Sequence, residues 1–470
     1  MSGPGTDLGG ARVLVISGEQ VGEQMAGPAI RSLNLAQQLL HHGADVTLAT
    51  PLPIEGLQPE LAGLRLTAFG KPSASRFRSL ARSHDIVLSQ PQRVDVAVGL
   101  HASGAQIIYD LYVPNFVERI AHLAGQPGDA ALRRNLLECE RIEYATAIEL
   151  GDAFICASQQ QRDHWLGALG QAGRLDLDLL DRDPDGRQLI DVVPFGLPDQ
   201  PPVVPSGDSP LRGGLLPKDS IILLWTGGLW NWFDPGLVLA GFDRARKVDP
   251  RLRFVVMGMD HPEGNWEETA TSSALRARAS ELGLLGPDGP VTLLAGWVPY
   301  RERHRYLKDA DAAVSAHHTN LETRFSFRTR FLDQLWCGLP TLTSAGGELT
   351  DRMINAGAAL SVADDPASWE AAILDFASDP RLRDSLSAAA TDLARDYRWS
   401  NVAAPLVTIA AQLMELRQTG RDHIPRARRH PLTTARYAAL LLQSRMRQRG
   451  LSGMGASLRS GLTGSRSPGE

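Results

Sequence analysis

The 470-residue chain has few cysteines and no long apolar run. Its three cysteines, Cys139, Cys156 and Cys337, are too few for a disulfide framework and form no CxxC pair, which fits a reducing compartment. No apolar stretch approaches the roughly 20 residues of a membrane-spanning helix, and residues 1–10 lack the pattern of a secretion signal. We therefore expect a cytoplasmic protein that meets a membrane, if at all, only at its inner face.

The sequence also lacks the excess of positive charge that is typical of nucleic-acid binders, because its net charge is −5. Residues 417–470 differ from the rest, with eleven arginines, no lysine and two acidic residues, a net charge of +9. This basic tail has two interpretations. It is either a flexible, solvated segment or a cationic amphipathic stretch around Tyr437–Leu442 that contacts anionic lipid.

Composition and patterning predict an α/β protein. The hydrophobic content of 43% and the charged content of 21% are ordinary for a globular chain, and short β-branched runs alternate with longer amphipathic stretches, as in parallel sheets. A segment rich in proline, glycine and serine, Pro194–Pro217, is typical of a linker. We predict two doubly wound Rossmann-like domains that face a cleft, residues 1–200 and 201–416, the second ending in a crossover helix, followed by the basic tail, 417–470.

Thirteen buried strands are predicted, seven before the linker and six after it. Ligands of doubly wound sheets bind beyond the carboxyl ends of the strands, so we expect the functional residues in the loops there. The predicted strands are Val13–Ser17, Asp45–Ala49, Leu64–Ala68, Ile86–Ser89, Ile107–Asp110, Ala153–Ala157, Asp191–Val193, Ile221–Thr226, Phe254–Gly258, Val291–Ala295, Ala312–Ala316, Pro340–Thr343 and Leu360–Val362.

Two segments of the first half carry candidate residues. The loop after the first strand leads through Gly27 and Pro28 into a helix that contains Arg31, and exposed N–H groups at a helix start favour a negative or hydroxyl-rich ligand. The alternative is a plain surface loop. Asp110 ends a predicted strand and is either a base or hydroxyl-binding carboxylate at the cleft or a cap of the following turn. Glu118 is compatible with an ordinary helix-surface charge.

The second half contains two glycine turns at strand ends. Thr226-Gly227-Gly228 stands beside a cluster of aromatic residues, and a glycine pair lets the backbone approach a phosphate closely. Alternatively, the glycines form only a turn and the aromatics only a core. Gly296-Trp297-Val298-Pro299 follows a later strand, where Trp297 and Val298 would make an apolar shelf for a nucleobase.

The densest group of candidate residues lies within Glu322–Pro340. Arg328, Thr329 and Arg330 stand at the start of a predicted helix, and guanidinium groups suit a diphosphate. Asp333 lies further along that helix, where its carboxylate can accept hydrogen bonds from a vicinal diol such as ribose. A solvated run of charge is the alternative, which the interleaved phenylalanines disfavour.

Together these motifs resemble GT-B glycosyltransferases, most closely the large family-four group of retaining sugar transferases. The resemblance covers roughly Arg12–Arg417 and implies an acceptor-binding first domain and a donor-binding second domain. It is carried by the Gly27-Pro28 loop, the Thr226-Gly227-Gly228 loop, the Gly296-Trp297-Val298-Pro299 turn, the helix end Cys337-Gly338-Leu339-Pro340 and Trp399 before the last helix.

The resemblance implies roles for individual residues. Of the family's two glutamates, which are separated by seven residues, the second corresponds to Asp333 and the first to Phe325, with Glu322 as the nearest acid. The family's diphosphate-binding Arg and Lys are absent from Gly227–Pro235, and we expect arginines of the later helix to replace them. The implied acceptor-binding residues are Gly27, Pro28 and Arg31, and the implied donor-binding residues are Gly227, Gly228, Trp297, Val298, Arg328, Thr329, Arg330 and Asp333.

The implied activity is a hexosyltransferase-type reaction. A sugar moves from a nucleoside-diphosphate sugar to a hydroxyl of a polysaccharide, a lipid-linked or a small-molecule acceptor, with retention of configuration and without a metal or other cofactor. The implied catalytic residues are Asp110, which positions the acceptor, Glu322 and Arg328. The chain's use of Arg, Ala and Gly suggests a bacterial source and bacterial polysaccharide synthesis. A nucleotide-sugar epimerase and a non-catalytic GT-B partner protein are the alternatives.

Overall fold

The structure is a computed structural model that describes residues 7–55, 61–123, 129–205, 207, 209–259, 269–419, 435–444 and 446. Its strands form two parallel sheets, one of seven strands and one of six. All thirteen predicted strands are present, and the two-domain α/β fold expected from the sequence is confirmed. The strands are β1 Arg12–Ile16, β2 Asp45–Thr50, β3 Arg65–Ala68, β4 Ile86–Ser89, β5 Gln106–Asp110, β6 Ala153–Cys156, β7 Ile190–Val192, β8 Ile221–Trp225, β9 Leu252–Val256, β10 Val291–Leu293, β11 Ala312–Ser315, β12 Thr341–Thr343 and β13 Ala359–Ser361.

The two sheets share one topology. The strand order is β3-β2-β1-β4-β5-β6-β7 in the first domain and β10-β9-β8-β11-β12-β13 in the second. In each sheet the order reverses beside the first strand, between β1 and β4 and between β8 and β11, and such a switch point opens a crevice at the carboxyl ends of the strands. Central strands such as β4 and β8 are buried along their whole length, as expected when helices cover both faces of a parallel sheet, whereas the edge strand β3 is largely exposed.

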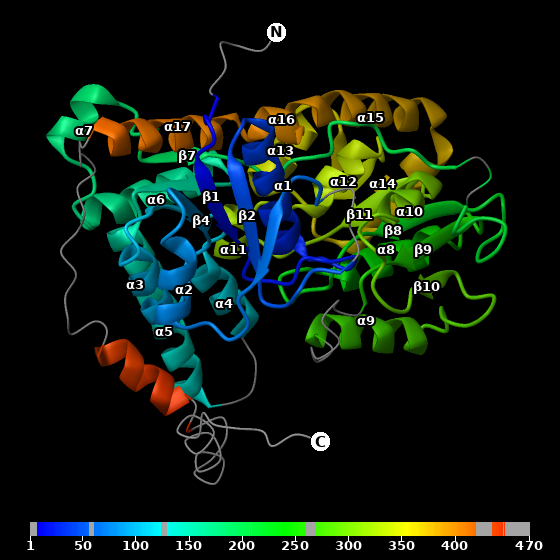
Figure 1. Ribbon diagram of the computed structural model, residues 1–470. Coiled ribbons are helices and arrows are strands. Elements are labelled where there is room, and N and C mark those ends of the chain that lie inside the picture. Colours follow the sequence, from blue (N-terminus) through cyan, green and yellow to red (C-terminus); the bar gives the residue numbers. More distant parts are fainter. Residues whose placement is uncertain are drawn as a thin grey trace, which may run out of the picture.

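Helices cover both sheets (Figure 1). In the first domain these are α1 Gly27–His41, α2 Ala74–Ala81, α3 Val94–His101, α4 Asn115–Leu123, α5 Ala130–Leu150, α6 Gln159–Gln171 and α7 Leu177–Arg182. In the second part of the chain they are α8 Pro235–Ala245, α9 Ala270–Glu281, α10 Arg303–Asp309, α11 Leu321–Phe325, α12 Arg330–Trp336, α13 Glu348–Asn355, α14 Pro366–Ser378, α15 Pro380–Leu393, a 3-10 turn Ala394–Tyr397, α16 Trp399–Val402 and α17 Ala404–Thr419.

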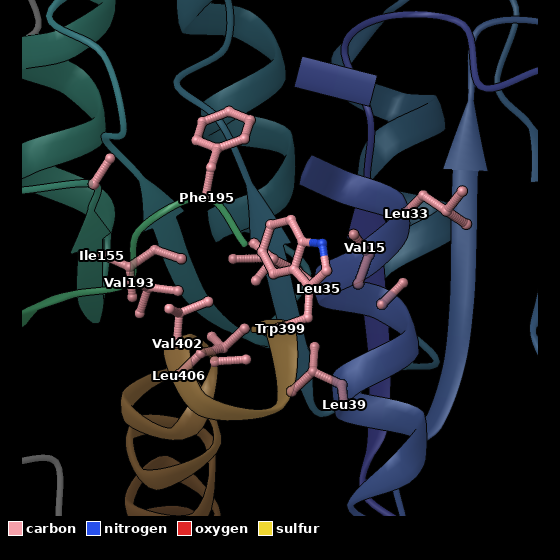
Figure 2. Packing of buried hydrophobic residues seen from close by; sticks show 14 of the residues in the cluster. Val15, Leu33, Leu35, Leu39, Ile155, Val193, Phe195, Trp399, Val402 and Leu406 are labelled. Atoms are coloured by element: carbon pink, nitrogen blue, oxygen red, sulfur yellow. The ribbon is translucent and has the colours of Figure 1, made fainter. Parts of the chain in front are cut away.

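The chain returns to the first domain at its end. Figure 1 shows α15, α16 and α17 running along one side of the molecule from the second domain to the first. Trp399 is buried in a hydrophobic cluster to which both domains contribute, between α1 and the strands of the first sheet (Figure 2). At this crossing the backbones of Leu197 and Trp399 are hydrogen-bonded at 2.9 Å. Gly196 is needed there, because a Cβ atom at this position would lie 2.4 Å from the Trp399 ring.

Part of the basic tail packs on the first domain. Residues 435–444 are helical and lie beside α5 (Figure 1). Tyr437 is buried against Cys139 and Ile142, and Arg436 forms an ion pair with Glu138 at 2.9 Å. Apolar burial thus places this segment of the tail on α5. Residues 420–434, 445 and 447–470 of the tail lie outside the described residues, and lipid contact stays a prediction.

Within the described ranges, no helix is both long enough and apolar enough to cross a bilayer.

Candidate active site

A cavity of about 580 Å³ lies between the two domains. Both domains contribute the loops that follow the carboxyl ends of their strands, which is where doubly wound sheets bind ligands. We call the lining residues within 1–200 the first-domain wall and the lining residues after position 200 the second-domain wall. Loops after β1, β4 and β5 form much of the first-domain wall, and loops after β8, β9 and β10 form much of the second.

The glycine loop after β8 brings main chain to the second-domain wall. Gly227 has φ +72°, a conformation that favours glycine, and Gly227 and Gly228 both line the cavity. Gly258 packs directly on this loop, since a Cβ atom there would lie 2.7 Å from the Gly227 carbonyl carbon. The side-chain amide of Gln334 holds the start of this loop in place, because its Nε2 donates to the Thr226 hydroxyl at 2.8 Å.

Arg330 supplies a buried cation beside this loop. Its Nη2 donates to the Gly228 carbonyl oxygen at 2.6 Å, and its guanidinium lies 3.8 Å from the centre of the Phe233 ring. Its buried Nη1 finds no hydrogen-bond partner among the described residues. Burial and the nearby charge of Arg328 lower the pKa of Arg330. A buried cation with an unused donor at a cavity wall is stabilised by an anionic ligand.

Arg328 and Glu322 form a buried pair in the same wall. Nη1 and Nη2 of Arg328 donate to the two carboxylate oxygens of Glu322 at 2.8 and 2.7 Å. Both side chains line the cavity. Because each Nη group of Arg328 is engaged by Glu322, Arg328 is less available to a diphosphate than Arg330.

The remaining predicted donor-binding residues also reach the cavity. Thr329, Trp297 and Val298 line it, as does Asp333. The Asp333 carboxylate is ion-paired with Arg303 at 2.9 Å, and the Arg303 guanidinium stacks 3.8 Å above the Tyr300 ring, so Asp333 is held in place. Thus the structure brings all eight predicted donor-binding residues together, and their ligand contacts stay predictions.

The start of α1 faces this wall from the first domain. Gly27 and Pro28 line the cavity, as the sequence predicts. A Cβ atom at Gly27 would lie 3.8 Å from the Phe195 ring and 4.0 Å from the Thr329 hydroxyl, so the two domains approach closely at this point.

Asp110 and Arg31 are not in the cavity wall. Arg31 Nε and Nη2 donate to the two Asp110 oxygens at 2.5 and 2.9 Å, and both side chains are buried. Arg31 Nη1 also donates to the Pro194 carbonyl oxygen at 3.0 Å. The sequence-based placement of Asp110 and Arg31 at the ligand surface is therefore wrong. Arg31 and Asp110 neutralise each other beneath the cavity surface. Their pairing, with the hydrogen bond to Pro194, connects α1 to the end of β5 and to the end of the first domain.

Two glutamates line the first-domain wall instead: Glu118, which the sequence left as an ordinary surface charge, and Glu140, which it did not mark. Glu118 on α4 and Glu140 on α5 both face the cavity. Arg119 bonds one Glu140 oxygen, Oε1, at 2.7 Å. Burial raises the pKa of Glu118 to about 8, and the charge of Glu322 across the cavity adds to this shift. No sequence pattern marks Glu118 as a cavity residue, because an acidic helix residue next to an arginine, here Arg119, usually faces solvent.

Sequence comparison relates the chain to known sugar transferases. Residues 241–408 match a family model described as glycosyl transferase-like. D-inositol 3-phosphate glycosyltransferase of Thermomonospora curvata is 28% identical over 215 residues, which are 42% of this chain and 46% of the relative. The enzyme of the same name from Stackebrandtia nassauensis is 26% identical over 260 residues, 54% of this chain and 55% of the relative. The chain spans about half the length of the curated relatives it matches.

Structure comparison extends this similarity to both domains. HepE of Anabaena, in a complex with UDP and glucose, has a TM-score of 0.60 at 16% identity, over 87% of this chain and 99% of HepE. WaaG, a glycosyltransferase involved in lipopolysaccharide biosynthesis, has a TM-score of 0.60 at 14% identity, over 85% of this chain and 99% of WaaG. At these identities the likeness shows the fold.

The two facing Rossmann-like domains and the cavity between them define the GT-B class. The family match in the second domain and the curated relatives confirm, in addition, the resemblance to glycosyltransferases of the family-four type that the sequence predicts.

Proposed function

We propose that this protein transfers a glycosyl group from a nucleoside-diphosphate sugar to a hydroxyl acceptor, with retention of configuration. One observation supports this most directly. Arg330 presents a buried guanidinium nitrogen that no described residue hydrogen-bonds, beside the Gly227-Gly228 main chain, in a cavity closed by a second domain. Such a wall suits a diphosphate, whose charge compensates the buried cation.

The proposed chemistry is largely electrostatic. As the bond between the sugar carbon and the diphosphate oxygen breaks, negative charge grows on the departing diphosphate, and Arg330 stabilises it. Glu322 and Arg328 face the sugar, and Asp333 accepts hydrogen bonds from the ribose hydroxyls. The acceptor oxygen, entering from the first-domain wall, bonds to the sugar carbon, and its proton passes to the departing diphosphate oxygen. Closure of the domains excludes the water that would hydrolyse the donor.

UDP-sugars are the first donors to examine, because HepE was solved with UDP and with UDP-glucose. Binding of UDP, GDP, dTDP and ADP to the purified protein by isothermal titration would identify the base. Transfer from the matching nucleotide sugars would then be followed by NMR, which reads the anomeric configuration of the product. Activity in EDTA would test the proposal that no metal is required.

Three outcomes separate the candidate functions. Release of the diphosphate with a glycosylated product supports the transferase. Conversion of the free nucleotide sugar into its epimer, with no acceptor consumed, would replace it by an epimerase. Nucleotide binding without turnover across a broad acceptor panel would favour a non-catalytic partner protein. A cytoplasmic location and a polysaccharide or lipid-linked acceptor stay predictions.

A further inference from the structure

The charges that line the cavity differ between its two walls. In the first-domain wall, the described residues that line the cavity include three acidic residues, Glu19, Glu118 and Glu140, and a single cation, Arg119. That cation is already bound to Glu140 at 2.7 Å. The positive charge of Arg31 is not available to this wall, because Arg31 is bound to Asp110 below the cavity surface.

The second-domain wall has the opposite character. Its carboxylates, Glu322 and Asp333, are each paired with an arginine, Arg328 and Arg303 respectively. Arg330 remains as an additional cation. An anionic ligand is therefore accommodated at the second-domain wall, whereas the described residues of the first-domain wall offer an anion no cation that is not already ion-paired.

Unpaired polar atoms in the first-domain wall indicate what that wall does bind. Oε2 of Glu140 is buried and accepts no hydrogen bond from any described residue, and Nε2 of Gln90 is buried and donates none. Both residues line the cavity. Leaving a buried polar group unsatisfied costs about 1–3 kcal/mol. One acceptor atom and one donor atom are together complementary to hydroxyl groups, each of which both donates and accepts.

Glu118 fits the same ligand. Its elevated pKa, about 8, keeps it largely protonated at neutral pH, so it presents an O–H donor and a carbonyl-type acceptor to the cavity. It lies on α4, which packs against α11, the helix that carries Glu322. Glu118 is thereby positioned at the boundary between the two walls, where an acceptor hydroxyl would meet the donor sugar.

We propose that Glu118 and Glu140 determine acceptor specificity, and that the acceptor is an uncharged, hydroxyl-rich molecule without a phosphate at the part that enters the cavity. This inference rests on the proposed transferase function, because it assigns the first-domain wall to the acceptor. It predicts a preference opposite to that of an enzyme built for a phosphorylated sugar, whose acceptor wall would hold unpaired arginine or lysine.

The test compares matched neutral and phosphorylated probes. The full-length protein, with UDP present, is titrated with glucose and glucose 6-phosphate, and with myo-inositol and its monophosphate, by calorimetry. We expect the neutral member of at least one pair to bind about tenfold more tightly or better, which corresponds to about 1.4 kcal/mol. In the Glu118→Gln/Glu140→Gln double variant, this preference should shrink or reverse through tighter binding of the phosphorylated probe.

Glu138→Gln is the matched control, because Glu138 lies on the same helix as Glu140 but pairs with Arg141 outside the cavity. It should leave the preference unchanged. Equal or tighter binding of the phosphorylated probes by the unmodified protein would overturn the inference, and so would failure of every probe to bind. UDP titration separates the two proposals, since protein that binds UDP but prefers phosphorylated probes keeps its donor site and loses only this inference.

Discussion

Arg330 Nη2 donates to the Gly228 carbonyl oxygen at 2.6 Å, so the same side chain fixes the glycine loop and offers its other nitrogen to the cavity. The family's usual diphosphate-binding Arg and Lys are missing after β8, and this arginine from a different element lies at the same loop. The proposed donor site therefore depends on α12 as much as on the loop itself.

Arg330→Ala should weaken nucleoside-diphosphate binding most among the arginines of this wall. Loss of one charge-assisted hydrogen bond costs about 1.5–3 kcal/mol, which is roughly a ten- to hundredfold increase in Kd. Arg328→Ala should have a smaller direct effect, because both Nη groups of Arg328 are engaged by Glu322. Titration with the nucleotide that the wild type binds measures both.

Arg324→Ala is the control for this pair of variants, because Arg324 is exposed on the neighbouring helix and does not line the cavity. Nucleotide affinity equal to that of the wild type in Arg330→Ala, in a folded protein, would show that the diphosphate is held elsewhere.

Asp110→Ala should lower the free energy of unfolding. It leaves the buried guanidinium of Arg31 without its carboxylate, and breaking a buried ion pair from one side costs about 3–5 kcal/mol. Chemical denaturation of the variant should report this loss. Asp392→Ala, which breaks the exposed pair with Arg395, should cost no more than about 1 kcal/mol. A fully stable Asp110→Ala protein with impaired transfer would instead support a direct role in catalysis.

Gly258→Ala should displace the glycine loop and reduce nucleotide affinity. Gly258 combines φ +78° with an approach of 2.7 Å between the added Cβ and the Gly227 carbonyl carbon, so the neighbouring backbone must move. Gly283→Ala provides the comparison, because its φ is +64° but the added Cβ meets nothing within 4 Å. Both variants should lose stability through backbone strain, whereas only Gly258→Ala should raise the Kd for the nucleotide.

Glu118 should make the stability of the protein depend on pH. In the folded state its pKa is about 8, against an ordinary value of 4.5, so between these values the folded state binds more protons than the unfolded state. Its contribution to stability is therefore greatest below pH 4.5 and declines as the pH rises to 8. Glu118→Gln removes this dependence, and its free energy of unfolding relative to wild type should increase over that range.

Denaturation curves at several pH values measure this difference. Burial lowers the pKa of His317 from 6.5 to about 3, so its own effect on stability lies between these pH values, and because His317 is present in both proteins this effect cancels in the comparison. A constant difference between the two proteins from pH 5 to pH 9 would mean that Glu118 is ionised normally.

The strands and the second-domain wall could be predicted from the sequence because they depend on local sequence patterns. Parallel strands covered on both faces give continuous apolar runs such as Ile221–Trp225, and a strand that ends on Gly227 and Gly228 marks a close approach of backbone. Resemblance to a family then indicated the residues of the later helix, including Arg330 and Asp333.

The first-domain wall could not be predicted in this way, because its character depends on contacts between distant residues. Arg31 and Asp110 are 79 positions apart, and their pairing removes both from the cavity. Glu118 and Glu140 lie on helices, where acidic residues usually face solvent, and only the approach of the second domain encloses them. The packing of Tyr437 on α5 is likewise invisible to composition, which records only the arginines around it.

The crossing at Trp399 has a consequence for the order in which the protein is made. The hydrophobic cluster at this crossing includes Trp399, Leu406 and Ile409, which the ribosome adds after nearly the whole chain. The first domain therefore cannot complete its core when its own last strand emerges, and the second domain, whose Phe331, Leu335 and Met353 belong to the same cluster, also awaits these late residues. A fragment ending near residue 200 would leave the surface that receives these side chains open to water and to aggregation.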